Sequence, residues 1–131
     1  MKKKVLITGG TGFIGRNVVD ELISRGWEVH SLVFPPFAPE KEGLIQYEMN
    51  LMDTDAVNKF LKEHNFENLI HLAWYVGPKC HVHDLNLDWT LATLNLLKNF
   101  KENGGKRNRT ECYSRPGRIG EAESQIRGTA K

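Results

Sequence analysis

The sequence predicts an α/β fold, a doubly wound parallel sheet of about four strands with helices on both faces. Short apolar stretches of strand length alternate along the chain with longer stretches in which apolar residues recur at helical spacing. A glycine-rich turn also joins the first strand directly to the first helix. Alternation of this kind is typical of parallel strands connected by right-handed helical crossovers. A ligand of such a sheet is expected at the carboxyl ends of its strands.

The glycine turn lies between an apolar strand at residues 5–7 and a helix that starts near Ile14. Its sequence fits both G-x-G-x-x-G and G-x-x-G-x-x-G, and reads Thr8-Gly9-Gly10-Thr11-Gly12-Phe13-Ile14-Gly15. In such a turn the glycines permit the tight bend, the approach of a pyrophosphate and the close packing of the helix. The helix N-terminus then points unpaired N–H groups at the phosphates. This combination predicts a Rossmann-like dinucleotide-binding domain. The alternative is a purely structural strand-turn-helix.

The later elements follow the same alternation. We predict strands over residues 27–34, 44–49 and 68–74, and a helix over 84–103. Between the last two strands, Asp53 or Thr54 is expected to cap a helix that runs to about His64. The last helix is expected to turn a stripe of leucines toward the core, namely Leu87, Leu91, Leu94 and Leu97. His71, in the strand over 68–74, is interpreted as a core histidine with satisfied hydrogen bonds rather than a catalytic one.

The end of the second strand would approach the adenosine ribose of a dinucleotide. NAD-binding domains usually place an Asp or Glu there, about 20 residues beyond the glycines. This sequence has Val33 and Phe34 instead, and no Arg stands there for a 2′-phosphate. Arg16 and the lysines at 2–4 are the nearest basic residues. The sequence therefore leaves the choice between NAD and NADP open.

The composition indicates where the protein is located and which classes of partner it does not bind. The chain has 131 residues, enough for one domain, and a net charge of +2. Two cysteines form no disulfide framework, so we expect a cytoplasmic protein. No apolar run has the length of a membrane span. The positive charge is concentrated in residues 104–131, but these contain one aromatic residue and interspersed glutamates, so we expect no nucleic-acid partner.

A cluster of potential metal ligands follows the fourth predicted strand. It consists of Cys80, His81, His83 and Asp84. Neighbouring side chains along a chain diverge, and the spacing matches no established zinc pattern. We therefore interpret the cluster as part of an exposed loop and predict no metal site.

Three segments together resemble the extended short-chain dehydrogenase/reductases. They are the glycine turn, the step Asn50-Leu51-Met52-Asp53, and His71-Leu72-Ala73. The most similar branch is the NAD-dependent epimerases and dehydratases, which act on nucleotide-linked sugars. The resemblance covers about residues 3 to 107, which is the first part of a typical member.

The resemblance implies a set of cofactor-binding residues. Those that would bracket the pyrophosphate are Gly9, Gly12, Phe13, Ile14 and Gly15. Asn50 stands where the family usually has an Asp that contacts the adenine amine, and Leu51 would offer its backbone to the adenine. Leu72, Ala73 and Trp74 would line the cofactor. In the last predicted helix, the family's Asn-x-x-Gly-Thr-x-Asn-Leu-Leu pattern is matched at Thr93 and at 95–97. Its first Asn is replaced by Trp89 and its Gly by Ala92.

The resemblance stops after Arg107. The family continues with an apolar fifth strand and a Tyr-x-x-x-Lys pair, in which the Tyr is the acid/base. Here Tyr113 is followed four residues later by Gly117, and residues 108–131 are rich in charge and poor in apolar side chains. We therefore predict a partial NAD(P)-binding domain over 1–107, a polar basic tail over 108–131, and no catalytic residue. A change of reading frame in the gene would explain this abrupt change in composition after Arg107. The alternatives are a short paralogue with its own tail and an artificially shortened chain.

Two functions follow from these observations. The first is the NAD(P)-binding part of a nucleotide-sugar epimerase, dehydratase or reductase, truncated or frame-shifted and inactive alone. The second is a non-catalytic dinucleotide sensor or regulatory module. Without a fifth strand, the fourth strand would present an exposed apolar edge, which predicts self-association.

Overall fold

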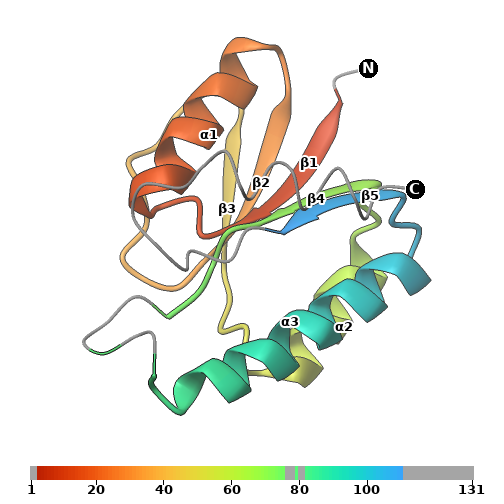
Figure 1. Cartoon of the computed structure of the whole chain (residues 1–131). Helices are drawn as coiled ribbons and strands as arrows, with labels where there is room; N and C mark the ends of the chain where they lie inside the picture. The colour runs from red at the N-terminus through yellow and green to blue at the C-terminus, as the bar shows by residue number, and fades with distance from the viewer. Residues whose placement is uncertain (1–2, 76–78, 80–81, 111–131) are drawn as a thin grey trace.

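The computed structural model describes residues 3–75, 79 and 82–110, which form one five-stranded parallel sheet with helices on both faces (Figure 1). The strands are β1 (Lys4–Thr8), β2 (Glu28–Val33), β3 (Leu44–Glu48), β4 (Asn68–His71) and β5 (Arg107–Thr110). The helices are α1 (Phe13–Ser24), α2 (Thr54–Glu63) and α3 (Leu85–Glu102). The spatial order of the strands is β3-β2-β1-β4-β5. The predicted α/β class and doubly wound parallel sheet are confirmed.

Two apolar layers sandwich the sheet. One lies under α1 and consists of the buried residues Val5, Ile7, Val19 and Val29. The other lies under α2 and α3 and consists of Leu6, Leu32, Val57, Phe60, Leu61, Phe66, Leu69, Leu96 and Phe100. Successive residues of β1 point to opposite faces, so this strand contributes to both layers. Figure 1 shows the corresponding arrangement, with α1 on one side of the sheet and α2 and α3 together on the other.

The fifth strand corrects one prediction. Three of the four residues of β5, 108–110, lie in the polar run where no fifth strand was expected. The strand pairs with β4 from Asn68↔Arg107 to His71↔Thr110. Its first three residues are exposed, so it needs no apolar side chains to join the sheet. Backbone hydrogen bonds suffice for a strand at the edge of a sheet, where both faces of the ribbon can remain polar. The sheet therefore extends to residue 110, beyond the expected domain boundary at 107.

The same strand removes the reason given for self-association. β4 was expected to expose an unpaired apolar edge, but β5 occupies that edge along the whole of β4. The outer edge on this side is β5, whose sequence is Arg-Asn-Arg-Thr. Charged residues on an edge strand disfavour pairing with another chain.

The orientation of α3 also differs from the prediction. Leu87, Leu91 and Leu94 are 71%, 66% and 60% exposed, so the expected leucine stripe does not face the core. The buried residues of α3 are Ala92, Thr93, Leu96 and Phe100. Leu97 packs against the core as expected. Two of the four buried residues, Ala92 and Thr93, are small, and side chains of this size let the middle of the helix lie close to the end of β4.

The start of α2 follows the predicted capping. The Asp53 carboxylate accepts a hydrogen bond from the Ala56 backbone N–H at 3.1 Å, which satisfies one of the unpaired donors of the first helical turn. Within the described part of the chain, none of the helices is both long and apolar enough to span a membrane.

Candidate dinucleotide-binding site

The glycine turn connects β1 to α1 through two close backbone contacts. Gly9 has a positive φ of 71°, and its carbonyl oxygen accepts a hydrogen bond from the Gly12 N–H at 3.1 Å. A Cβ atom added at Gly15 would lie 1.9 Å from that same oxygen. Only glycine therefore fits at 15 in this turn, which brings the first turn of α1 against the end of β1.

The turn also touches the segment that follows β4. A Cβ atom added at Gly9 would lie 2.6 Å from the Ala73 nitrogen and 2.7 Å from the Leu72 carbonyl carbon. β1 and β4 are neighbours in the sheet. The strand order reverses between them, because β2 and β3 lie on one side of β1 and β4 and β5 lie on the other. Ligands of open α/β sheets bind at this point, outside the carboxyl ends of the strands.

A buried polar network holds the ends of β1 and β4 together. Thr8 and His71 are 0% and 1% exposed, and the Thr8 Oγ1 and the His71 Nδ1 lie 2.5 Å apart. The other ring nitrogen of His71, Nε2, lies 2.9 Å from the Thr93 Oγ1 on α3. Burial lowers the pKa of His71 from 6.5 to about 4, so the imidazole is neutral at pH 7. The interpretation of His71 as a core histidine with satisfied hydrogen bonds is confirmed.

The open side of the site is formed by the start of α1. Phe13 is 77% exposed, and Ile14 is exposed as well. The guanidinium carbon of Arg16 lies 5.4 Å from the centre of the Phe13 ring. Gly12 occupies the N-cap position and has no side chain, so the N–H groups of the first turn are accessible there. A helix N-terminus of this kind favours an anionic group.

Trp74 is held at the other side of the site by α3. Its indole Nε1 donates a hydrogen bond to the Asn86 side-chain oxygen at 2.9 Å. Its ring also lies 6.2 Å from that of Trp89. Trp89 stands where the family pattern has its first Asn, so in this chain an aromatic contact occupies that position.

Asn50 and Leu51 lie apart from the glycine turn. They follow β3, which is separated from β1 by β2. The Asn50 Oδ1 accepts a hydrogen bond from the Met52 N–H at 3.0 Å, so part of its acceptor capacity is already used. Leu51 packs against the core beneath α2 and α3. The expected site residues therefore form two groups along the carboxyl edge of the sheet, one at β1 and β4 and one at β3.

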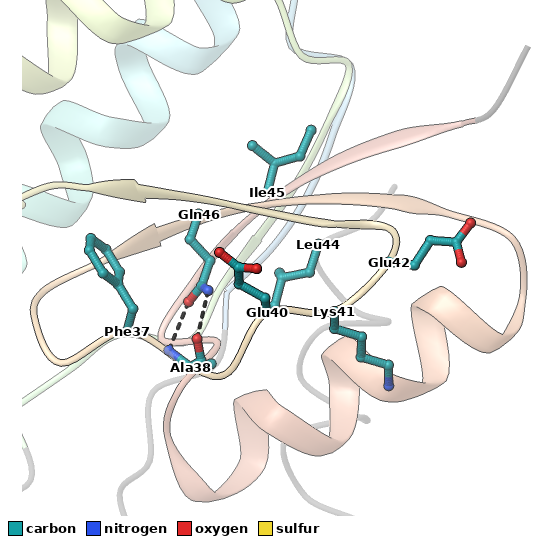
Figure 2. A pocket seen from close by; sticks show the side chains of 8 residues that line it. All are labelled: Phe37, Ala38, Glu40, Lys41, Glu42, Leu44, Ile45 and Gln46. Atoms are coloured by element: carbon teal, nitrogen blue, oxygen red, sulfur yellow. Dashed lines mark hydrogen bonds between the residues drawn. The ribbon is translucent and has the colours of Figure 1, made fainter.

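The residues at the end of β2 carry no charge. Val33 is buried, whereas Phe34 is 72% exposed. Beyond them, the loop before β3 forms a shallow groove with that strand, in which the Gln46 amide pairs with both backbone groups of Ala38 at 2.9 Å (Figure 2). The groove is lined by Phe37, Ala38, Glu40, Lys41, Glu42, Leu44, Ile45 and Gln46. None of the predicted site residues lines it.

Sequence reasoning missed two functional groups of this site, the hydroxyls of Thr8 and Thr93. Thr8 stands directly before the glycines and Thr93 in the helix pattern of the family, but nothing in the sequence pairs either of them with His71. The cluster of potential metal ligands, interpreted above as an exposed loop, can be checked only in part, because Cys80 and His81 lie outside the described residues. The described residues hold no group of three His, Cys, Asp or Glu side chains suited to a metal ion.

A Tyr-x-x-x-Lys spacing does occur in the chain, at Tyr75 and Lys79. It stands after β4 rather than after β5, and Gly77 and Pro78 lie between the two residues. Lys79 has a positive φ of 57°. A helix would place residues four apart on one face, but this backbone is not helical at Lys79. The spacing therefore does not stand where the family has its pair, which follows the fifth strand.

Comparison with known proteins agrees with this geometry. The chain is 32% identical over 114 residues to the dTDP-4-dehydro-6-deoxyglucose reductase of Escherichia coli, and the match covers 79% of this chain and 36% of the reductase. It is 32% identical over 122 residues to the UDP-glucose 4-epimerase of Bos taurus, covering 75% of this chain and 34% of the epimerase. The chain thus spans about a third of the length of these relatives.

Solved structures resemble the described part closely. The UDP-glucose 4-epimerase of Thermus thermophilus in complex with NAD superimposes with a TM-score of 0.68 at 31% identity, covering 80% of this chain and 36% of that one. The UDP-glucose 4-epimerase of Thermotoga maritima with UDP-glucose gives a TM-score of 0.69 at 26% identity, covering 82% and 37%. The model of the NAD dependent epimerase/dehydratase family matches residues 5–110, from β1 to the end of β5. The chain therefore belongs to the NAD dependent epimerase/dehydratase family.

Proposed function

We propose that this chain binds NAD or NADP and is the cofactor-binding part of a nucleotide-sugar epimerase, dehydratase or reductase. The observation that carries this proposal is the contact between the glycine turn and the end of β4, at the point where the strand order reverses. Relatives named for nucleotide-sugar chemistry and a solved complex with NAD support it.

Each group of residues has a role in this proposal. The backbone from Gly9 to Gly15 and the N-terminus of α1 hold the pyrophosphate. Leu72, Ala73 and Trp74 line the cofactor beside them. Asn50 and Leu51, one strand beyond β2, contact the adenine. Among the described residues, the side-chain N–H groups of Asn50 have no hydrogen-bond partner, so in this proposal they retain the capacity to bind a base edge.

When bound, the cofactor supplies the hydride chemistry, whereas the protein positions it. We propose that residues 1–131 alone give no turnover, because the Tyr-x-x-x-Lys pair is missing from its place after β5. The nucleotide-linked sugar is then a ligand of the complete enzyme. The cytoplasmic location that we propose rests on cysteine usage.

Binding of NAD and NADP to the purified chain, measured by isothermal titration calorimetry, tests the proposal. We expect binding by the wild-type chain and its loss in Gly15→Ala, because the added Cβ would overlap the Gly9 carbonyl oxygen. Gly26→Asn is the matched control: Gly26 has a positive φ that Asn tolerates, and no atom lies within 4 Å of an added Cβ. Absence of binding by the folded wild-type chain would overturn the proposal.

The second candidate is a non-catalytic dinucleotide sensor or regulatory module, whose partner would be bound through residues 108–131. Both candidate functions require dinucleotide binding, so a binding assay does not distinguish them. Turnover would distinguish a complete enzyme from either candidate, and binding of a specific partner would distinguish the sensor from the cofactor-binding part of an enzyme. Hydride transfer to or from a nucleotide sugar, followed by the absorbance of the reduced nicotinamide, would contradict inactivity. Specific capture of a partner through residues 108–131 would favour the sensor.

A further inference from the structure

We propose that His71 is a positioning residue that acts through the Thr8 hydroxyl to hold the segment of Leu72 and Ala73 against Gly9. This proposal rests on the proposed function, because the segment in question is the wall of the cofactor site beside the glycine turn. The three groups come from two strands: Thr8 ends β1, His71 ends β4, and Leu72 and Ala73 follow directly.

The direction of each hydrogen bond follows from counting donors and acceptors at Thr8. The backbone N–H groups of Leu72 and Ala73 both point to the Thr8 Oγ1, each at 3.2 Å. These two donors use the two lone pairs of the hydroxyl oxygen. The hydroxyl proton is therefore left to donate to the remaining neighbour, the His71 Nδ1 at 2.5 Å. A proton on that nitrogen would give the oxygen a third donor.

This assignment fixes the tautomer of the imidazole. A neutral ring whose Nδ1 accepts a hydrogen bond carries its proton on Nε2. The Nε2–H then donates to the Thr93 Oγ1 at 2.9 Å, which anchors the ring to α3. The lowered pKa of His71 agrees with a neutral ring. The chain of hydrogen bonds thus runs from α3 through His71 and Thr8 to the backbone after β4.

The network acts most directly on Ala73. The Leu72 N–H has a second acceptor, the Thr8 carbonyl oxygen at 3.1 Å, so it keeps a partner if the hydroxyl is removed. The Ala73 N–H has only the hydroxyl as an acceptor among the described residues. The Ala73 nitrogen is also the atom nearest to a Cβ built on Gly9. A shift of Ala73 would therefore change the contact between the two halves of the site.

Thr8→Val removes the hydroxyl and keeps the shape of the side chain. We expect it to weaken NAD binding about tenfold, because the partly buried Ala73 N–H loses its partner and the wall of the site shifts. Thr110→Val is the matched control: Thr110 pairs with His71 across β4 and β5, and its buried hydroxyl has no partner among the described residues. We expect this control to bind NAD like the wild-type chain.

A second pair of variants covers the case in which Thr8→Val does not fold. Thr8→Ser keeps the hydroxyl and loses the methyl group, whereas Thr8→Ala loses both. We expect Thr8→Ser to bind NAD with nearly wild-type affinity and Thr8→Ala to bind about tenfold more weakly. Equal affinities of two folded variants that differ in the hydroxyl would overturn the positioning role and leave the proposed function intact.

The histidine tautomer gives a readout that needs no cofactor. The 15N spectrum of the free wild-type chain is expected to show an unprotonated Nδ1 and a protonated Nε2 for His71. A protonated Nδ1 would overturn the hydrogen-bond assignment, whatever the chain binds. If the tautomer is as assigned but the wild-type chain binds neither NAD nor NADP, the proposed function fails and the role of His71 in a cofactor site fails with it.

Discussion

Lowering the pH from 7 to 5 is expected to destabilise the fold through protonation of His71. The pKa of this histidine falls from 6.5 in the unfolded chain to about 4 in the folded protein, because the ring is buried. Between these two values the unfolded chain binds more protons than the folded one, so the free energy of unfolding falls as the pH falls. The contribution of the neutral His71 to the free energy of unfolding is fully present above the unfolded pKa of 6.5, and it is lost progressively as the pH falls toward the folded pKa of about 4.

The magnitude follows from the two pKa values. Their difference corresponds to about 3 kcal/mol in total, of which about 2 kcal/mol appears between pH 7 and about pH 5. A small domain is stable by roughly 5–15 kcal/mol, so this loss is measurable. The side chains that contact the ring by hydrogen bonds from β1 and α3 are the uncharged hydroxyls of Thr8 and Thr93, and its neighbour on β5 is Thr110. None of these compensates a positive charge on the ring.

Protonation also breaks the network described above. An imidazolium has donors on both nitrogens, so the Thr8 hydroxyl loses its acceptor at Nδ1. The new N–H would then compete with the N–H groups of Leu72 and Ala73 for the same oxygen. In the folded chain this protonation occurs near pH 4, so NAD binding is expected to change little between pH 7 and 5 and to weaken as the pH approaches 4.

Urea denaturation over a series of pH values measures this effect. His71→Asn keeps a polar side chain but does not titrate, so its free energy of unfolding is expected to fall by about 2 kcal/mol less than that of the wild type over this pH range. Thr110→Val leaves His71 in place and should follow the wild-type slope. Parallel curves for the wild type and His71→Asn would refute the reasoning.

Three further measurements test other parts of the structure. Asp53→Ala removes the cap of α2 and should lower the free energy of unfolding by about 1 kcal/mol in urea denaturation. Leu96→Ala should lower the free energy of unfolding by about 3 kcal/mol because Leu96 is buried, whereas Leu91→Ala should lower it by less than about 0.5 kcal/mol because Leu91 is exposed. Equal losses would contradict the observed orientation of α3. Because Phe34 replaces an acidic residue after β2, calorimetric Kd values for NAD and NADP are expected to agree within about tenfold, and a larger preference would show that another group reads the ribose.

The sequence predicted best those features that local chemistry determines. The glycine turn, the cap at Asp53 and the alternation of strands and helices each depend on residues close together in the chain, and all three are found in the structure. The network of Thr8, His71 and Thr93 joins residues 22 and 63 positions apart, so its partners could not be chosen from the sequence alone. The sequence did indicate that His71 has hydrogen-bond partners in the core, but it did not identify them.

The two errors in the fold have one physical cause, because both came from judging an element by its apolar content. On α3 the larger apolar residues Leu87, Leu91 and Leu94 are exposed, and the buried positions include Ala92 and Thr93. The small side chains of Ala92 and Thr93 permit the close approach that brings Thr93 within hydrogen-bonding distance of His71.

The residues of β5 contain too few apolar side chains to be predicted as a strand. The backbone of β4 nevertheless pairs with them, because backbone hydrogen bonds do not depend on the side chains. Hydrophobicity decides how strongly a face is driven to be buried, whereas close packing and backbone pairing decide which face lies inside and where a sheet ends. On α3 the exposed apolar side chains are Leu85, Leu87, Leu91 and Leu94, whereas β5 at the edge of the sheet is polar.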